Sequence, residues 1–226
     1  MTNTATLEHY PDSDEQIETR SFEVDRDIIW SLVFRQNKSL VGAVLELIQN
    51  SFDAKAKKIE IIISNTGFSV RDNGKGFSNR EQIESWFEVF GFTGKDVDDS
   101  KFGRFRMGRG QIMGHSKSTW HSGQFKMEVD VKNKGLNYQL HTLSQKHEGC
   151  LIEGDWYEDL TNQNEFSYQL RHENKDAIVS FCEKIKNRVK YMVGIDIWLN
   201  NDFINNHKQT EYLYEDEFFY FLEEPD

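Results

Sequence analysis

Cysteine, proline and long hydrophobic runs are all scarce in this chain of 226 residues. Its two cysteines, Cys150 and Cys182, are far apart and lack CxxC or Cys/His spacing, which argues against a disulfide scaffold and a structural zinc site. The two prolines, Pro11 and Pro225, lie near the ends, so no interior proline marks a domain boundary. The N-terminus lacks an apolar signal segment, and no run of about 18 apolar residues could span a membrane. These absences predict a soluble, cytoplasmic protein.

Positive charge is also in short supply. The chain has 27 Lys and Arg against 38 Asp and Glu, a net charge of −11, which argues against broad, non-specific binding of nucleic acid. A local role for nucleic acid stays undecided, because one basic island exists between Ser100 and Ser118, with no acidic residue inside it. The hydrophobic content of 37% and aromatic content of 13% are sufficient for a well-packed core.

Hydrophobic periodicity predicts helices and strands interspersed along the chain. The expected helices cover residues 26–36, 39–54, 78–90 and 175–192. The expected strands cover residues 22–25, 58–64, 67–71, 125–131, 137–142, 150–157 and 195–199, the last followed by a turn at 200–202. This order predicts an α+β fold, a two-layer α/β sandwich with the helices on one face of a mixed, mostly antiparallel sheet.

Three domain segments are expected. Residues 1–20 are polar and acidic and are interpreted as a flexible tail. Residues 21–205 would form the globular domain. Residues 206–226 are acidic and aromatic and are interpreted as an extension, or as the start of a further domain.

For the helix at 78–90, Ser78 is expected to be the cap, with one apolar side made of Ile83, Trp86, Phe87 and Phe90.

The helix expected at residues 39–54 is the first stretch that suggests chemistry. Ser39 is placed as its N-cap. At 3.6 residues per turn, Glu46, Asn50 and Asp53 fall within about sixty degrees of one another. The opposite, apolar side would hold Val41, Leu45, Ile48 and Phe52. A solvated face on an ordinary amphipathic helix is the alternative interpretation.

Two glycine-rich stretches follow that helix. Asp72-Asn73-Gly74-Lys75-Gly76-Phe77 reads as a hairpin turn, but its second glycine also permits close approach of a ligand to the backbone. Residues 91–114 hold six glycines together with basic side chains, and a helix is expected from about Arg109 onward. A helix N-terminus behind a basic glycine loop is suited to binding an anion. A Walker A loop is excluded, because Gly91–Asp96 has the wrong spacing.

The order and spacing of these stretches resemble the GHKL superfamily of ATP-binding domains, which includes gyrase B, heat-shock chaperones, histidine kinases and MutL and has the Bergerat fold. Glu46-Leu47-x-x-Asn50-Ser51-x-Asp53-Ala54 is similar to the N box of that family. Asp72-x-Gly74-x-Gly76-Phe77 is similar to the second motif. Gly103-Arg-Phe-Arg-Met-Gly108-Arg-Gly110 is similar to the third, and Gly149-Cys150-Leu151-Ile152 occupies the place of the fourth. The resemblance runs from about Phe22 to Ile204.

The resemblance implies ATP and Mg²⁺ as cofactors and a role for each matched residue. Glu46 would be the general base that activates water, and Asn50 would be a ligand of Mg²⁺. Asp72 would accept a hydrogen bond from the adenine amine. The remaining candidates for nucleotide binding are Asp53, Gly74, Gly76, Phe77, Lys95, Lys101, Gly103, Arg106, Met107, Gly108, Arg109, Gly110, Gln111 and Cys150.

The family pattern further implies slow ATP hydrolysis that drives lid closure and dimerisation as a conformational switch. A homodimer formed through the lid or the N-terminal segment, and a transducer domain or partner protein, are the expected partners beside ATP and ADP. Two departures favour an alternative, a nucleotide-gated interaction module with negligible hydrolysis: Arg106 stands where the family has glycine, and Cys150 where it has threonine. A protein kinase of the same fold is a third hypothesis, and Glu46 argues against it.

Overall fold

The computed structural model describes the chain from the central helix onward, in six stretches. These are residues 39–90, 108–163, 166 and 176–205, together with the backbone of 212–215 and 220–222. The tail at 1–20, the strand at 22–25, the helix at 26–36 and most of the glycine-rich segment are predictions that lie outside the described residues.

A six-stranded sheet forms one layer of the molecule, with the strand order β3-β4-β2-β1-β5-β6. Every neighbouring pair is antiparallel except β1 and β5, which are parallel. The strands are β1 (Lys58–Ile63), β2 (Gly67–Asp72), β3 (Ser116–Val129), β4 (Tyr138–Trp156), β5 (Asp196–Leu199) and β6 (Asp202–Phe203). A separate two-stranded sheet pairs β7 (Tyr212–Glu215) with β8 (Tyr220–Leu222). The prediction of a mixed, mostly antiparallel sheet is therefore confirmed.

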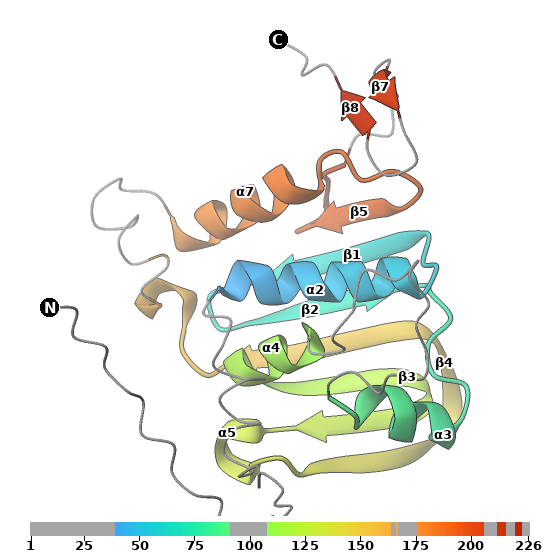
Figure 1. The fold of residues 1–226 in the computed structure, drawn as a ribbon. Coiled ribbons are helices and arrows are strands. Elements are labelled where there is room, and N and C mark those ends of the chain that lie inside the picture. The colour runs from blue at the N-terminus through green and yellow to red at the C-terminus, as the bar shows by residue number, and fades with distance from the viewer. Residues whose placement is uncertain are drawn as a thin grey trace, which may run out of the picture.

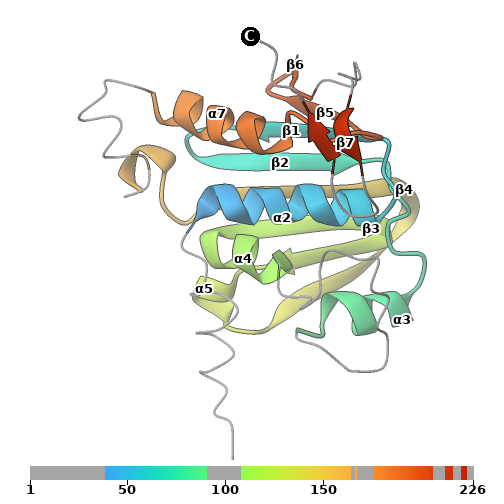
Figure 2. The same ribbon diagram turned by 45° about the horizontal axis from the view of Figure 1, so that its top comes forward.

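Among the described residues, three helices form the second layer on one face of this sheet: α2 (Leu40–Asp53), α4 (Gly108–His115) and α7 (Ala177–Val189) (Figures 1 and 2). The α2 helix lies between the other two and contacts both. Shorter elements are α3 (Arg80–Gln82), the π-helical η2 (Ile83–Phe87), α5 (Val131–Lys134) and the 3₁₀ turn η3 (Leu160–Asn162). The expected two-layer α/β sandwich is thus confirmed.

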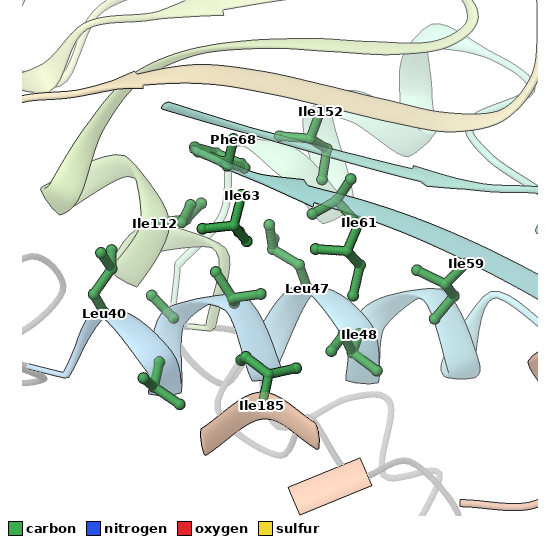
Figure 3. Packing of buried hydrophobic residues seen from close by; sticks show 14 of the residues in the cluster. Leu40, Leu47, Ile48, Ile59, Ile61, Ile63, Phe68, Ile112, Ile152 and Ile185 are labelled. Carbon is green, nitrogen blue, oxygen red and sulfur yellow. The ribbon is translucent and has the colours of Figure 1, made fainter. Parts of the chain in front are cut away.

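The core lies between α2 and the sheet. Figure 3 shows Leu47 of α2 directed toward the sheet, where Ile61 of β1 lies, while Ile48 lies on another side of the helix and Ile112 of α4 and Ile185 of α7 flank α2. All five side chains are at most 1% exposed. Burying one such side chain contributes roughly 1.5–3 kcal/mol, so this cluster holds the helix layer onto the sheet.

The start of α2 agrees with the sequence, but its buried face is rotated from the expected one. Ser39 is the N-cap, and its hydroxyl accepts a hydrogen bond from the Gly42 N–H at 3.1 Å. Leu45 and Phe52, expected inside, are only partly buried, whereas Ser51 is 3% exposed. Because α2 packs against α4 and α7 as well as the sheet, its buried side is set by three neighbours and not by the sheet alone.

The β3–β4 hairpin is longer than the sequence suggested. The strand expected at 125–131 instead begins at Ser116, directly after α4, and ends at Val129, and the two strands expected at 137–142 and 150–157 are one continuous strand, β4. The register shifts between Ser122 and Gly123 and between Gly123 and Phe125. Buried positions of β3 therefore change from even to odd residue numbers at this bulge, which breaks the alternation that predicts a strand.

The helix expected at residues 78–90 is also different. Its cap is Asn79, whose side chain accepts from the Gln82 N–H at 2.9 Å, and not Ser78. The chain then widens into η2, closed by a bond from the Glu88 N–H to the Ile83 carbonyl. In this wider turn Phe87 stays buried, but Trp86 is 42% exposed instead of lying on the apolar side.

Candidate functional site

Glu46 lies in the middle of α2 and faces the first residue of α4. A Cβ atom added to Gly108 would lie 2.9 Å from Cδ of Glu46 and closer still to its Oε2. Any side chain at position 108 would therefore displace either the carboxylate or the helix. The absence of a side chain at Gly108 is what lets the backbone of α4 cover the carboxylate.

Burial changes the acidity of Glu46. Desolvation raises the pKa of its carboxyl group above the ordinary value, and the negative charge of Asp53 on the same helix raises that pKa further. Asp53 itself accepts a hydrogen bond from Gln49 Nε2 at 3.3 Å. A carboxylate with a raised pKa is a stronger proton acceptor when ionised, so Glu46 has the property that a general base needs.

Asp72 is the second carboxylate of the site, at the end of β2. It is 7% exposed. Its Oδ1 accepts from the Gly74 N–H at 2.8 Å, and its Oδ2 lies 2.9 Å from the hydroxyl of Ser51. Burial raises the pKa of Asp72, although the bonds from Gly74, Ser51 and the backbone of Cys150 oppose that rise.

Ser51, on the same helix as Glu46, bonds to Asp72. Its hydroxyl is also 3.1 Å from the Leu47 carbonyl, so its one proton is shared between that oxygen and Asp72. One helix therefore carries Glu46 toward α4 and Ser51 toward β2. Sequence reasoning did not assign a role to Ser51, although a serine on an apolar helix face was a usable signal.

The glycine turn after Asp72 is held against the end of α2. The Lys75 N–H donates to the Ala54 carbonyl at 3.0 Å. A Cβ on Gly74 would lie 2.9 Å from the Cβ of Ala54, and the side chain of Asn73 accepts from two backbone N–H groups at the start of β1. The prediction of a hairpin turn here was wrong, because this segment leads from β2 to α3 and does not join two strands. Its bonds make it a fixed part of the domain.

Ser122 on β3 fixes the other end of that turn. Its hydroxyl is fully buried, accepts from the Phe77 N–H at 2.8 Å and donates to the Gly149 carbonyl at 3.1 Å. Gly149 has a φ of +69°, and a Cβ there would lie 2.8 Å from the carbonyl carbon of Asp72. Gly76, with φ of +60°, also lies against this junction. Sequence reasoning did not identify Ser122, because its partners come from distant strands.

Ser122→Ala is expected to destabilise the domain by about 1–3 kcal/mol, because two buried backbone groups lose their partner. It should also weaken nucleotide binding by loosening the turn. Ser116→Ala is the matched control: Ser116 is fully buried on the same strand face but bonds only to the Ile112 carbonyl, at 2.9 Å. Urea unfolding and nucleotide titration check both variants. Equal effects of the two changes on nucleotide affinity would contradict the role given to Ser122.

Cys150 lies directly opposite Asp72 in the β2–β4 register. Burial raises the pKa of its thiol, and the charge of Asp72 raises it further, so the sulfur is a neutral thiol. Cys150 and Cys182 are both free, which agrees with the prediction that neither forms a disulfide. A thiol is a weaker hydrogen-bond partner than a hydroxyl, so Asp72 depends mainly on Ser51 and Gly74.

The third motif is only partly described. Gly108, Arg109, Gly110 and Gln111 form the first turn of α4, whereas Lys95, Lys101, Gly103, Arg106 and Met107 lie outside the described residues. Arg109 is 9% exposed, and its Nε donates to the Phe87 carbonyl at 2.9 Å. The guanidinium group therefore binds to the end of η2.

The metal ligands implied by the sequence are few. Among the residues that the structure describes, no group of three or more His, Cys, Asp and Glu side chains could hold a metal ion. Asn50 lies exposed on α2, one turn after Glu46, and supplies a hard amide oxygen of the kind that Mg²⁺ accepts. One protein oxygen fits a magnesium ion that takes its other ligands from phosphates and water.

In the described part of the chain, no helix is long and apolar enough to cross a bilayer.

Comparison with protein families agrees with this arrangement. Residues 38–164 match the model of the histidine kinase-, DNA gyrase B- and HSP90-like ATPase family. The match covers more than half of the chain and includes α2, the turn after Asp72 and the start of α4. The chain therefore belongs to this family and is an ATPase-like domain of the GHKL class, as the sequence motifs predicted. No curated protein matches the chain.

Three solved structures are similar to the chain at low identity, and the first of them shares its fold. The ATPase region of Saccharomyces cerevisiae topoisomerase II, bound to ICRF-187 (dexrazoxane), is 16% identical, with a TM-score of 0.51 over 75% of this chain and 50% of that one. The Aquifex aeolicus MutL ATPase domain complexed with ADP is 20% identical, with a TM-score of 0.44 over 72% of this chain and 60% of that one. The N-terminal domain of a DNA repair protein is 21% identical, with a TM-score of 0.48 over 76% and 51%. The chain thus spans only half to three-fifths of these structures.

Proposed function

We propose that this domain binds ATP with Mg²⁺ and hydrolyses it slowly. The observation that carries the proposal is the half-buried carboxylate of Glu46, packed against Gly108 at the start of α4 and raised in pKa by burial. Family membership supports ATP as the ligand. The ATP-binding domain would be residues 21–205, between the tail at 1–20 and the extension at 206–226.

Asp72 is the proposed acceptor for the adenine amine. Its carboxylate is buried and already oriented by Ser51 and Gly74, so it would lose little entropy on binding the base. Gly76, Phe77 and Cys150 would line the same end of the pocket. A purine with a carbonyl at this position, as in inosine, would face the carboxylate with an acceptor and bind poorly.

The phosphates would lie at the N-terminus of α4. This end of the helix begins at Gly108, and the partial positive charge of a helix N-terminus favours an anion there. Asn50 would hold Mg²⁺, which neutralises phosphate charge when bound, and Asp53, less than one turn after Asn50 on α2, is a further proposed nucleotide contact. Lys95, Lys101, Gly103, Arg106 and Met107 are further proposed contacts.

Hydrolysis needs one proton acceptor beside the γ-phosphate. Glu46 would remove a proton from a water molecule as the water oxygen bonds to the γ-phosphorus and the bond from phosphorus to the ADP oxygen breaks. The products are ADP and inorganic phosphate. Covering of Glu46 by the start of α4 would keep bulk water away from this step.

ATP binding would act as a switch. Lid closure, homodimerisation and coupling to a transducer domain or partner protein are the proposed consequences, and a cytoplasmic location is proposed with them. The alternative, a nucleotide-gated interaction module without turnover, is favoured by one observation, the neutral, buried Cys150 beside Asp72.

A single-turnover assay at saturating Mg-ATP tests the proposal. We expect inorganic phosphate to appear slowly, and EDTA to stop its release while ATP is still bound weakly. ATP bound without phosphate release, alone or with candidate partners, would support the interaction module. Radiolabelled γ-phosphate attached to protein would indicate the kinase. Absence of ATP binding at millimolar concentration would contradict all three.

A further inference from the structure

Arg109 is a buried arginine that donates to backbone carbonyl groups of the segment after α3. Its Nε donates to the Phe87 carbonyl at 2.9 Å, a second guanidinium nitrogen donates to the Val89 carbonyl, and the guanidinium carbon lies 4.2 Å from the centre of the Phe90 ring. These carbonyls follow the last turn of η2, where helical carbonyls have no partner within the helix. A cation at this end of a helix also interacts favourably with the helix dipole.

Arg109 is directly bonded in sequence to Gly108, which packs against Glu46. The position of Gly108 therefore depends on where the guanidinium group is anchored. On the far side, Ile112 and Met113 of α4 are buried in the core. The start of α4 is thus held at two points, the core and the end of η2, and Gly108, which covers Glu46, directly precedes the second of them.

We propose that Arg109 is a positioning residue for Glu46: by binding the carbonyls that end η2, it holds Gly108 against the Glu46 carboxylate. Only the naming of Glu46 as the base rests on the proposed function. The contact itself does not require turnover. The backbone N–H groups of the first turn of α4 would then bind the nucleotide, while the Arg109 side chain holds that turn in position through its bonds to the end of η2.

Arg109→Lys tests this inference because it keeps the charge and removes the planar fork that reaches two carbonyls. The measurement is the titration of the Glu46 carboxyl group by ¹³C NMR, with its signal assigned by Glu46→Gln. Among the described residues, Asp53 of α2 is the charge that raises the pKa of Glu46, and it is unchanged in the variant. We expect the pKa of Glu46 to fall toward its ordinary value as water reaches the carboxylate.

Two further variants keep the test decisive. Arg80→Lys is the matched control, because Arg80 lies on the neighbouring α3, is exposed and pairs with Glu84 at 3.0 Å; the pKa of Glu46 should not change. Phe90→Leu removes the ring under the guanidinium group but leaves Arg109 in place. It should therefore lower the pKa of Glu46 by less than Arg109→Lys does. An unchanged Glu46 titration in folded Arg109→Lys, or in Phe90→Leu if the lysine variant does not fold, would overturn the proposal.

Turnover gives a second, independent measurement. Arg109→Lys should lower kcat about tenfold in the native background and cause no further loss in Glu46→Gln, because both changes act on one group. Equal losses in both backgrounds would indicate general damage to the fold and count against the proposal. If Glu46→Gln alone left hydrolysis unchanged, the proposed function would fail, and the NMR titration would still decide whether Arg109 positions Glu46.

Discussion

Glu46→Gln is expected to lower kcat for ATP hydrolysis by about 10²–10⁴-fold, the contribution typical of general acid–base catalysis. ATP affinity should change little, because the amide has nearly the same shape beside Gly108. Phosphate release under single-turnover conditions and equilibrium titration with ATP measure the two quantities separately. A variant that hydrolyses ATP at the native rate while binding it normally would show that Glu46 is not the base.

The pH dependence of kcat tests the same role of Glu46, and Asp53→Asn is the matched variant for this test. Glu46 accepts a proton only when ionised, and its pKa is raised, so activity should fall with decreasing pH sooner than for an ordinary glutamate. Asp53 is the second cause of that rise. Asp53→Asn should therefore lower the pKa of Glu46 and move the acidic limb of the profile to lower pH without abolishing turnover. A limb that stays in place would argue that another group titrates.

Asp72→Asn is expected to weaken ATP binding by about 10–100-fold, since a hydrogen bond to a charged acceptor contributes roughly 1.5–3 kcal/mol. The oxygen of the new amide can keep the bond from the Gly74 N–H, and its NH₂ group can donate to Ser51, whose hydroxyl still donates to the Leu47 carbonyl. The neutral amide is nevertheless a weaker acceptor for the adenine amine than the carboxylate. The sharpest comparison uses ITP, whose base has a carbonyl in place of the amine. The native domain should prefer ATP to ITP strongly, and Asp72→Asn should lose most of that preference. An unchanged preference would place the base elsewhere.

Stability measurements separate this binding defect from misfolding. Burial raises the pKa of Asp72 in the folded state above its unfolded value, so the fold binds the proton more tightly. Stability of the native protein should therefore decrease as pH rises from the ordinary carboxyl pKa through the raised one. Asp72→Asn lacks this titration, so its loss of charge should cost no stability at neutral pH. A large drop in Tm at neutral pH would show that the Ser51 and Gly74 contacts require the carboxylate.

Local chemistry was sufficient to predict α2, the β1–β2 hairpin and the polar face with Glu46 and Asn50. Helix periodicity and the Ser39 cap depend on residues within a turn or two of one another, so they can be read from the chain directly. The ordered motifs were sufficient for the family as well, because each motif occupies one short segment.

Features that depend on contacts between distant parts of the chain could not be predicted from local sequence patterns. Ser122 reaches Phe77 and Gly149 from a different strand, and the bulge beside it reverses which residues of β3 are buried. The π-helical turn that exposes Trp86 is likewise a departure from the periodicity on which helix prediction rests.

The sequence by itself determined which residue types stand in each motif and, through helical spacing, that Glu46, Asn50 and Asp53 share a face. Only the tertiary structure decided what each of them faces. Packing of α4 on α2 brings Gly108 over Glu46, and burial raises the pKa of the Glu46 carboxyl group. The guanidinium group of Arg109, a member of the basic island in the sequence, binds to the end of η2. The reason is physical: desolvation and hydrogen-bond partners depend on which elements pack together, and spacing along one chain does not specify that.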